Sequence, residues 1–311
     1  MRSAAEKLSY VPHSAGQALR ARRVGAVAVV VPHSTQHLFA HPVLIDLLEG
    51  IMSVANRRGL MTILSTSDDE DDVDSAYTRI SRGRRADGVI VVAAAATDVH
   101  AAQLSRAGYP VVIVGRSPLV PSVSSFGVDD VSGAYDATRH LIERHGAARI
   151  AHVSGPLHHQ SAVDKRDGFV AALRDAGLTL NPRLQFEGDH TEQSGWKAAQ
   201  ELLPLVDQTD AVFCANDQMA MGLLQALRDA SVDVPSRLAI VGYDDHPVIR
   251  YAQPALATVG ADMVRVGVEA AERLIEIIES GDAEPVHTLL PTHLLLRASC
   301  GCSSDRDPAS P

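Results

Sequence analysis

Short apolar runs alternate with helix-length amphipathic stretches along most of the chain. From residue 24 onward the runs are rich in Val and Ile, are bounded by turn residues and are apolar on both faces, as buried parallel strands must be. This alternation predicts an α/β protein with parallel sheets. The expected strands are residues 24–31, 60–65, 88–92, 111–114, 150–153, 184–186, 211–214 and 238–241, and the expected helices include 43–57, 133–144, 168–176, 194–203 and 218–230.

Eight strands are too many for one small sheet, so the pattern predicts two doubly wound lobes. The length of 311 residues agrees, because a domain takes roughly 100–200 residues. Ligands of open parallel sheets bind beyond the carboxyl ends of the strands. Two facing lobes would therefore share one cleft, and the loops after each strand are the places to look for function.

Composition narrows the class of protein. The chain is 46% apolar and 21% charged, which excludes wholesale disorder, collagen and coiled-coil rods. No run approaches the roughly 18 apolar residues of a membrane span, and the start has no apolar leader, so we expect no membrane partner and a cytoplasmic protein. Three cysteines suit a reducing compartment. We expect Cys300 and Cys302 to be exposed thiols without function in a disordered tail at 300–311.

Charge is distributed unevenly. The net charge is -10, yet residues 1–23 carry five basic residues against one acid, a sum of +4. A short basic arm on an acidic body can bind a polyanion at one end. The alternative is a solvated, frayed terminus.

Polar residues follow the last two expected strands. Asn216 and Asp217 come directly after one strand; one of them is expected to cap the next helix and the other to face the cleft. Asp244 comes after the next strand, and a carboxylate there can accept hydrogen bonds from two ligand hydroxyls. A turn or a metal role is the competing interpretation of Asp244.

A Gly-Pro turn and the pair His158 and His159 follow the strand at 150–153. Loop polarity explains His158, whereas His159 is a candidate cleft contact. Adjacent histidines point in different directions, and no third ligand is evident. The sequence shows no cluster of carboxylates or imidazoles at metal-ligand spacing, so we expect no metal and no cofactor.

Motifs of enzymes on doubly wound folds are missing. The chain has no GxxxxGK[ST] phosphate loop and no GxSxG elbow. The pairs Asp129-Asp130 and Asp244-Asp245 are adjacent, so their side chains diverge rather than share a proton. Asp129-Asp130 is expected to begin a helix. We therefore expect a protein that is not an enzyme.

An ordered set of segments resembles the LacI/GalR (lactose/galactose-repressor) family of transcription regulators, over roughly residues 2–299. The resemblance implies a core like that of periplasmic sugar-binding proteins, with two lobes joined by three crossovers. It implies a first lobe at 24–127 plus 260–286 and a second at 128–259 plus 287–299. The segments are VGAVAVVVP, ADGVIVV, PVVIVGR, FGVDDVSGAYDATRHLIERHGAARIAHVSGP, DGFVAALRDAGL, AVFCANDQMAMGLLQALRDASVDVPSRLAIVGYDD and PALATV.

The resemblance also implies the ligand contacts. Asn216 and Asp244 stand where family members bind sugar hydroxyls. Lys165 stands where the family usually has arginine, and lysine lacks the bidentate fork of a guanidinium. His190 stands where many members have an aromatic residue; histidine stacks less well and could be charged in a negative cleft. A sugar or sugar-like effector is expected, with purines and phosphorylated sugars left open. The implied contacts are Val43, Leu44, His159, Ser161, Lys165, His190, Asn216 and Asp244.

Two further implications concern assembly and DNA. A twofold homodimer is expected, with the helix at 43–57 as a candidate interface, although its apolar stripe also fits core packing. Residues 4–12 resemble the last helix of the family's DNA-binding headpiece, and residues 13–20 resemble its hinge helix. In relatives such hinge helices enter the minor groove, which makes His13, Ala15, Leu19 and Arg20 the candidate DNA contacts.

Leu19 is the residue expected to wedge between base pairs; the alternative is that it packs on its own lobe. The family's helix-turn-helix would stand before Met1. Three explanations of the missing helix-turn-helix are left open: a misassigned start of the sequence, a trimmed chain or a natural loss. Without those base-reading helices we expect no tight operator binding, so operator DNA is a partner only if the headpiece exists. An exported sugar-binding protein of the same fold is the alternative function.

Overall fold

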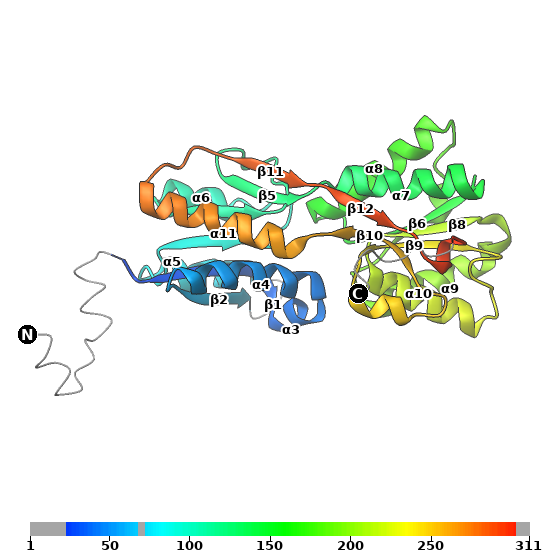
Figure 1. Ribbon diagram of the computed structural model, residues 1–311, viewed down its shortest axis with the longest axis horizontal. Coiled ribbons are helices and arrows are strands. Elements are labelled where there is room, and N and C mark those ends of the chain that lie inside the picture. Colours follow the sequence, from blue (N-terminus) through cyan, green and yellow to red (C-terminus); the bar gives the residue numbers. More distant parts are fainter. Residues whose placement is uncertain (1–22, 68–71, 303–311) are drawn as a thin grey trace, which may run out of the picture.

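Two α/β lobes lie end to end along the long axis of the protein (Figure 1). The structure, a computed structural model, describes residues 23–67 and 72–302. Each lobe contains a six-stranded sheet with helices on both faces, which confirms the expected fold class. Among the described residues, no helix is both long enough and apolar enough to cross a bilayer. The candidate hinge contacts His13, Ala15, Leu19 and Arg20 lie outside the described residues.

The first sheet is parallel throughout, in the order β11-β5-β4-β3-β1-β2. Its strands are β1 (Ala26–Ser34), β2 (Met61–Ser67), β3 (Gly88–Val91), β4 (Val111–Val114), β5 (Ser124–Val128) and β11 (His287–Leu290). Its helices are α3 (Thr35–Ala40), α4 (Pro42–Arg57), α5 (Val73–Ser81), α6 (His100–Arg106) and α11 (Met263–Ser280).

Strand β1 shows why its sequence is an unbroken apolar run. Val27 and Val29 pack in the cluster formed with α4 and α11, whereas Ala28 and Val30 pack in the cluster formed with α5 and α6. Successive side chains of a strand point to opposite faces, and both faces of this sheet are covered. The alternation therefore produces no polar face.

Helices α4 and α11 touch backbone to backbone. A Cβ on Gly50 would collide with the Val264 carbonyl oxygen, and one on Gly267 would collide with the Leu47 carbonyl oxygen. Glycine at both positions therefore sets the distance between the two helices.

The second sheet has the order β12-β10-β9-β8-β6-β7 and is parallel except for β12, an antiparallel edge strand. Helices α7 and α8 cover one face, and α9 and α10 cover the other. The strands are β6 (Ile150–Ser154), β7 (Gln185–Glu187), β8 (Ala211–Cys214), β9 (Ala239–Asp244), β10 (Ala257–Ala261) and β12 (Thr292–Leu295). The helices are α7 (Asp130–His145), α8 (Gln160–Asp175), α9 (Glu192–Leu202) and α10 (Asp217–Asp229), with 3-10 turns at η1 (Pro182–Leu184), η2 (Leu203–Gln208), η3 (Pro247–Tyr251) and η4 (Ala298–Cys300).

The chain crosses between the lobes three times, from β5 to α7, from β10 to α11 and from β11 to β12. Two of the lobe borders expected from the sequence fall elsewhere. Strand β10 stays in the second sheet as far as Ala261, so the second crossover follows 261 rather than 259. Strand β11 pairs with β5 of the first sheet, so the third crossover lies at Pro291 rather than between 286 and 287.

The expected disordered tail is wrong at its beginning. Cys300 ends η4 and is fully buried, in the core cluster beneath α7 and α8. Cys302 is partly buried and packs against the same cluster. The two thiols are therefore not exposed, because the last described residues fold back onto the second lobe. Residues 303–311 lie outside the described residues.

Candidate functional site

The carboxyl ends of the strands of both sheets open onto one cleft between the lobes. In each sheet the strand order reverses at its first strand, β1 next to β3 and β6 next to β8. Doubly wound sheets hold their ligands at such switch points. Loops after β1, β3, β4, β6, β8 and β9 line the cleft, and all eight residues expected to contact a ligand are among its lining.

Lys165 forms the charged centre of the cleft. Its ammonium donates a hydrogen bond to the Ala215 carbonyl oxygen at 3.1 Å and lies 3.8 Å from the centre of the Tyr243 ring. The ammonium nitrogen is 3.6 Å from a carboxylate oxygen of Asp130 and 3.9 Å from one of Asp244. One cation thus stands between two carboxylates, one at the start of α7 and one at the end of β9.

The surroundings of Asp244 disfavour the charged form of its carboxyl, and its backbone is strained. The pKa of its carboxyl is raised to about 7: burial raises it most, Lys165 lowers it, and the nearby carboxyls of Asp130 and Asp46 raise it. Burial likewise raises the pKa of Asp130. The backbone of Asp244 has a φ of 111°, which favours glycine. Strain and a perturbed pKa at a strand end are typical of a functional position.

Asn216 caps helix α10 and lines the cleft. Its side-chain oxygen accepts a hydrogen bond from the Met219 N–H at 2.9 Å, and its amide nitrogen donates to the His190 carbonyl oxygen at 2.9 Å. Asp217, the non-capping neighbour, also lies in the lining of the cleft. Its carboxylate accepts from Thr258 Oγ1 at 2.7 Å and from the His246 N–H at 2.9 Å, so it is satisfied within the lobe.

Two imidazoles form part of the second-lobe wall. The Nε2 atom of His159 is buried and has no hydrogen-bond partner among the described residues, which leaves it available to a ligand. His190 lies against Gly155, where a Cβ would collide with His190 Nε2. Burial lowers the pKa of His159 to about 3, and burial followed by Lys165 lowers the pKa of His190 well below its usual value. His190 is therefore neutral at neutral pH, which answers the question of its charge that the sequence left open.

The first lobe supplies further histidines that the sequence analysis missed. His37 and His41 lie on and after α3, and their rings are 4.2 Å apart. The ring of His33 stacks on that of His37 at 4.3 Å. Burial lowers the pKa of His37 to about 3, so its imidazole is also neutral. The spacing of four residues from His33 to His37 to His41 was a visible signal, but it became meaningful only once α3 folded against the cleft.

The remaining expected residues lie at the starts of two helices. Val43 and Leu44 belong to the first turn of α4, where Leu44 also packs in the core of the first lobe. Ser161 is exposed near the start of α8 and faces the cleft. Helix starts present free N–H groups and suit polar ligands.

Hydrogen bonds bridge the two lobes across the cleft. Arg116 follows β4 in the first lobe, and its guanidinium binds both carboxylate oxygens of Asp164 on α8, with Nε 2.9 Å from Oδ2. Gln218 of α10 lies 3.2 Å from His41 Nδ1 and donates to the Ala40 carbonyl oxygen at 2.9 Å. The structure therefore shows the lobes drawn together. Arg116 and Asp164 were not expected as cleft residues, because their pairing depends on how the two lobes approach one another.

The cleft as a whole offers acceptors, donors and one apolar wall. Asp130 and Asp244 accept, Lys165 donates, and the segment 93–96 contributes alanine side chains. This mixture suits a small polar molecule with an apolar face, held by a few placed polar groups.

Comparisons with known proteins agree with this architecture. A sequence profile of the periplasmic binding protein-like domain matches residues 138–300. The transcriptional regulator CelR of Thermobifida fusca is 35% identical over 303 residues, which cover 96% of this chain and 88% of CelR. The PurR repressor of Aliivibrio salmonicida is 30% identical over 277 residues, 89% of this chain and 81% of PurR.

Solved structures give the same result. A CelR–cellobiose complex superposes with a TM-score of 0.83 at 33% identity, over 96% of this chain and 89% of that chain. A LacI regulator from Bacillus cereus subsp. cytotoxis superposes with a TM-score of 0.84 at 25% identity, over 90% and 99% of the two chains. Since the sequence, the two sheets and the cleft between them all match these regulators, the chain belongs to the LacI family of transcriptional regulators and carries their periplasmic binding protein-like domain.

Proposed function

We propose that this protein is a LacI-type regulator that binds a sugar in the cleft between its lobes and couples that binding to DNA, without turning the sugar over. The observation that carries the proposal is the carboxylate of Asp244. It stands at the end of β9, half-buried on a strained backbone, with Lys165 as its neighbouring cation. A ligand with two adjacent hydroxyls would donate to both oxygens and relieve the buried charge.

A β-linked glucose disaccharide is the first ligand to test. The relative with the highest identity quoted above is bound to cellobiose in its structure. In this chain, His159 Nε2, which has no partner within residues 23–67 and 72–302, and the ammonium of Lys165 supply polar contacts from the second lobe. Val43 and the alanines at 93–96 supply an apolar surface from the first lobe, suited to the apolar face of a sugar ring.

A ligand that contacts both lobes would couple sugar binding to DNA binding. The Arg116–Asp164 pair and the Gln218–His41 hydrogen bond already join the lobes, and a bound sugar would add contacts on both sides. In a dimer, closing each cleft moves the two first lobes relative to one another and changes the spacing of the segments that precede them. Operator DNA is the proposed second partner.

The proposed homodimer joins first lobes. Helix α4 turns Leu47 and Ile51 into the core, so the stripe noticed in the sequence serves packing. The outer face of α4 and the edge strand β2 still expose large apolar side chains. These are Ile45, Met52, Met61 and Leu64.

Titration calorimetry with cellobiose, ribose, other mono- and disaccharides and purine bases tests the proposal. We expect one site per chain for a glucose disaccharide and recovery of the unaltered sugar afterwards. Asp244→Asn should weaken binding by about 10-fold or more, because a charge-assisted hydrogen bond contributes about 1.5–3 kcal/mol. Asp207→Asn is the control, since that carboxylate is 95% exposed and outside the cleft.

Three outcomes would contradict the proposal. They are that no sugar binds, that Asp244→Asn binds as well as the unchanged protein, or that the sugar is consumed. A purine that binds with the same dependence on Asp244 would keep the cleft assignment and change the ligand class.

A further inference from the structure

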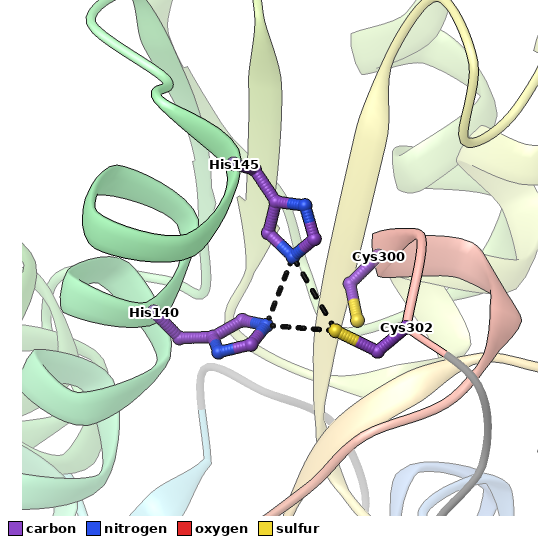
Figure 2. A group of neighbouring side chains, drawn as sticks. All are labelled: His140, His145, Cys300 and Cys302. Atoms are coloured by element: carbon purple, nitrogen blue, oxygen red, sulfur yellow. Dashed lines mark hydrogen bonds between the residues drawn. The ribbon is translucent and has the colours of Figure 1, made fainter.

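The last described residues place two sulfur atoms against the end of α7 (Figure 2). We call residues 297–302 the C-terminal hook. Cys300 and Cys302 belong to this hook, and His140 and His145 belong to α7. In Figure 2 the two imidazoles and the two sulfurs converge on one point. One ligand atom of each residue lies within 4.8 Å of all the others.

The distances among three of the four ligand atoms fit one tetrahedral ion. The two imidazole Nε2 atoms are 3.1 Å apart, and Cys302 Sγ is 3.6 Å from His140 Nε2 and 3.5 Å from His145 Nε2. Zinc bonds of about 2.0–2.1 Å to nitrogen and about 2.3 Å to sulfur give tetrahedral edges of about 3.3 Å between nitrogens and about 3.6 Å between nitrogen and sulfur. These three atoms are therefore close to tetrahedral spacing, and Cys300 Sγ lies within 4.8 Å of each of them.

The backbone at both ends explains how four side chains meet. His145 is the last residue of α7, where the chain turns away at Gly146, so its imidazole can reach the ring of His140 five residues earlier. Gly301 has a φ of 89°, a left-handed conformation that favours glycine, and it separates the two cysteines. A Cβ there would make ordinary contact with His145 Cε1 at 3.5 Å, so the cost of a side chain at 301 would come from the left-handed backbone and not from the imidazole.

We propose that His140, His145, Cys300 and Cys302 bind one zinc ion that fastens the C-terminal hook to α7. Two thiolates and two imidazoles form a donor set that binds zinc in preference to hard cations such as Mg²⁺ and Ca²⁺, which prefer oxygen ligands. Four protein ligands leave no open position, which makes the ion structural rather than catalytic. An iron–sulfur cluster does not fit, because its ligands must surround more than one metal atom.

The surroundings keep the ligands ready. His140 is 9% exposed and Cys300 is fully buried, so both are shielded from water. The contacts of the Cys302 sulfur with the two imidazoles are weak hydrogen bonds at best, and bonds to a shared cation would replace them at a large gain.

The zinc site is separate from the ligand cleft. Ser299 of the hook donates to the Ile240 carbonyl oxygen at 2.7 Å and accepts from the Ala257 N–H at 2.8 Å, at the amino ends of β9 and β10. Asp244 stands at the carboxyl end of β9, at the other end of the lobe. The zinc would therefore fix the base of the second lobe, where the sequence alone suggested thiols without function and no metal.

Metal analysis of the full chain, purified without a histidine tag and under reducing conditions, tests the proposal. After growth with zinc we expect one equivalent per chain. Cys302→Ser and His145→Gln should each weaken zinc binding by more than about 100-fold, measured by competition with a chromogenic chelator, because a direct ligand of the ion is lost. Cobalt reconstitution of the unchanged protein should give tetrahedral visible bands and a charge-transfer band of two thiolates, which does not depend on the variants folding.

Three control variants separate this site from other cysteines and histidines. Cys214→Ala removes the third cysteine, His293→Ala removes an exposed histidine, and His37→Ala removes a cleft histidine. All three should keep one zinc. The proposal is overturned if the unchanged protein holds no stoichiometric zinc or if Cys302→Ser and His145→Gln retain it. It is also overturned if His37→Ala loses the zinc, or if a Cys300–Cys302 disulfide persists under reducing conditions.

Discussion

The carboxylate of Asp244 is proposed to bind the ligand, but its charge lowers the stability of the folded protein. Its pKa in the folded protein is about 7, above the ordinary value of 3.8. The folded state therefore binds this proton more tightly than the unfolded state does. The resulting contribution to stability is full below about pH 4 and is lost as the pH rises through about 7. At pH 8 the carboxylate is charged and destabilises the fold.

We expect Asp244→Asn to raise the free energy of unfolding by a few kcal/mol at pH 8, because asparagine removes a buried charge and tolerates positive φ better than most residues. The gain should shrink at pH 5, where the carboxyl of the unchanged protein is already protonated. Urea denaturation at both pH values measures it. An equal gain at both would show that the charge is not the source.

Gly155 controls the position of a cleft imidazole. In Gly155→Ala the new methyl group would occupy the place of His190 Nε2, so the ring must turn away. We expect the thermal midpoint to change little and the affinity for the sugar to fall about 10-fold. Calorimetry in a His190→Ala background is the control: there the second substitution should have no further effect, and an undiminished effect would disprove the steric explanation.

Elements whose pattern is local were predictable from sequence. Strands β4 and β8 begin and end where the apolar runs predicted, and α10 differs by one residue at each end. Strand β5 was not expected, because Ser124 and Ser125 interrupt its apolar pattern. Both serines are buried, and each is satisfied by a segment more than 160 residues away: Ser124 Oγ accepts from the Val286 N–H, and Ser125 Oγ lies 2.8 Å from His287 Nδ1.

Edge strands β11 and β12 were missed for a related reason. Their side chains are exposed or half-buried in all but one position, so no apolar run marks them. Their pairing partners, β5 and β10, lie far back in the sequence. A short strand of this kind is created by its neighbour rather than by its own residues.

The contact between α4 and α11 gives a prediction at the scale of elements. Gly267→Ala should force the helices apart at the Leu47 carbonyl oxygen and lower the free energy of unfolding by about 1–3 kcal/mol. Because α4 carries Val43 and Leu44 into the cleft, sugar affinity should fall as well.

Chemical denaturation and calorimetry measure the two effects of Gly267→Ala. Glu272→Ala, on the solvent side of the same helix, is the control and should change stability by less than about 0.5 kcal/mol. If Gly267→Ala leaves the protein as stable as before, the helices can separate without cost and the explanation fails.

The bridge between lobes makes a prediction for the whole molecule. Arg116→Gln removes the bidentate pair with Asp164, whose carboxylate keeps only Gln160 as a side-chain donor at 2.7 Å among the described residues. We expect the sugar-free variant to shift toward an open arrangement with a larger radius of gyration in X-ray scattering, and saturating sugar to reverse the shift. Arg139→Gln, an exposed change on α7, is the control. No change in radius for Arg116→Gln would mean that other contacts hold the lobes.

At this scale the sequence predicted the lobes better than it predicted the site. The residues Lys165 and Asp244 were found because doubly wound sheets bind ligands beyond their strand ends and because the family resemblance pointed to the same loops. Arg116 and Asp164 could not be found in this way, because their pairing depends on how the two lobes approach one another. The cysteine–histidine group joins residues 155 positions apart, between His145 and Cys300, and no local spacing connects them.

The three crossovers leave neither lobe as a continuous stretch of chain, and this has a consequence for synthesis on the ribosome. The first sheet is nearly complete when Val128 has emerged, but the core on one of its faces needs Val266, Ala270 and Leu274 of α11. At about 5–20 residues per second, that helix follows roughly 7 to 27 s later. For that interval α4 alone covers this face of the sheet, and we expect the apolar surface left exposed to bind chaperones and the speed of translation between residues 128 and 263 to affect the yield of folded protein.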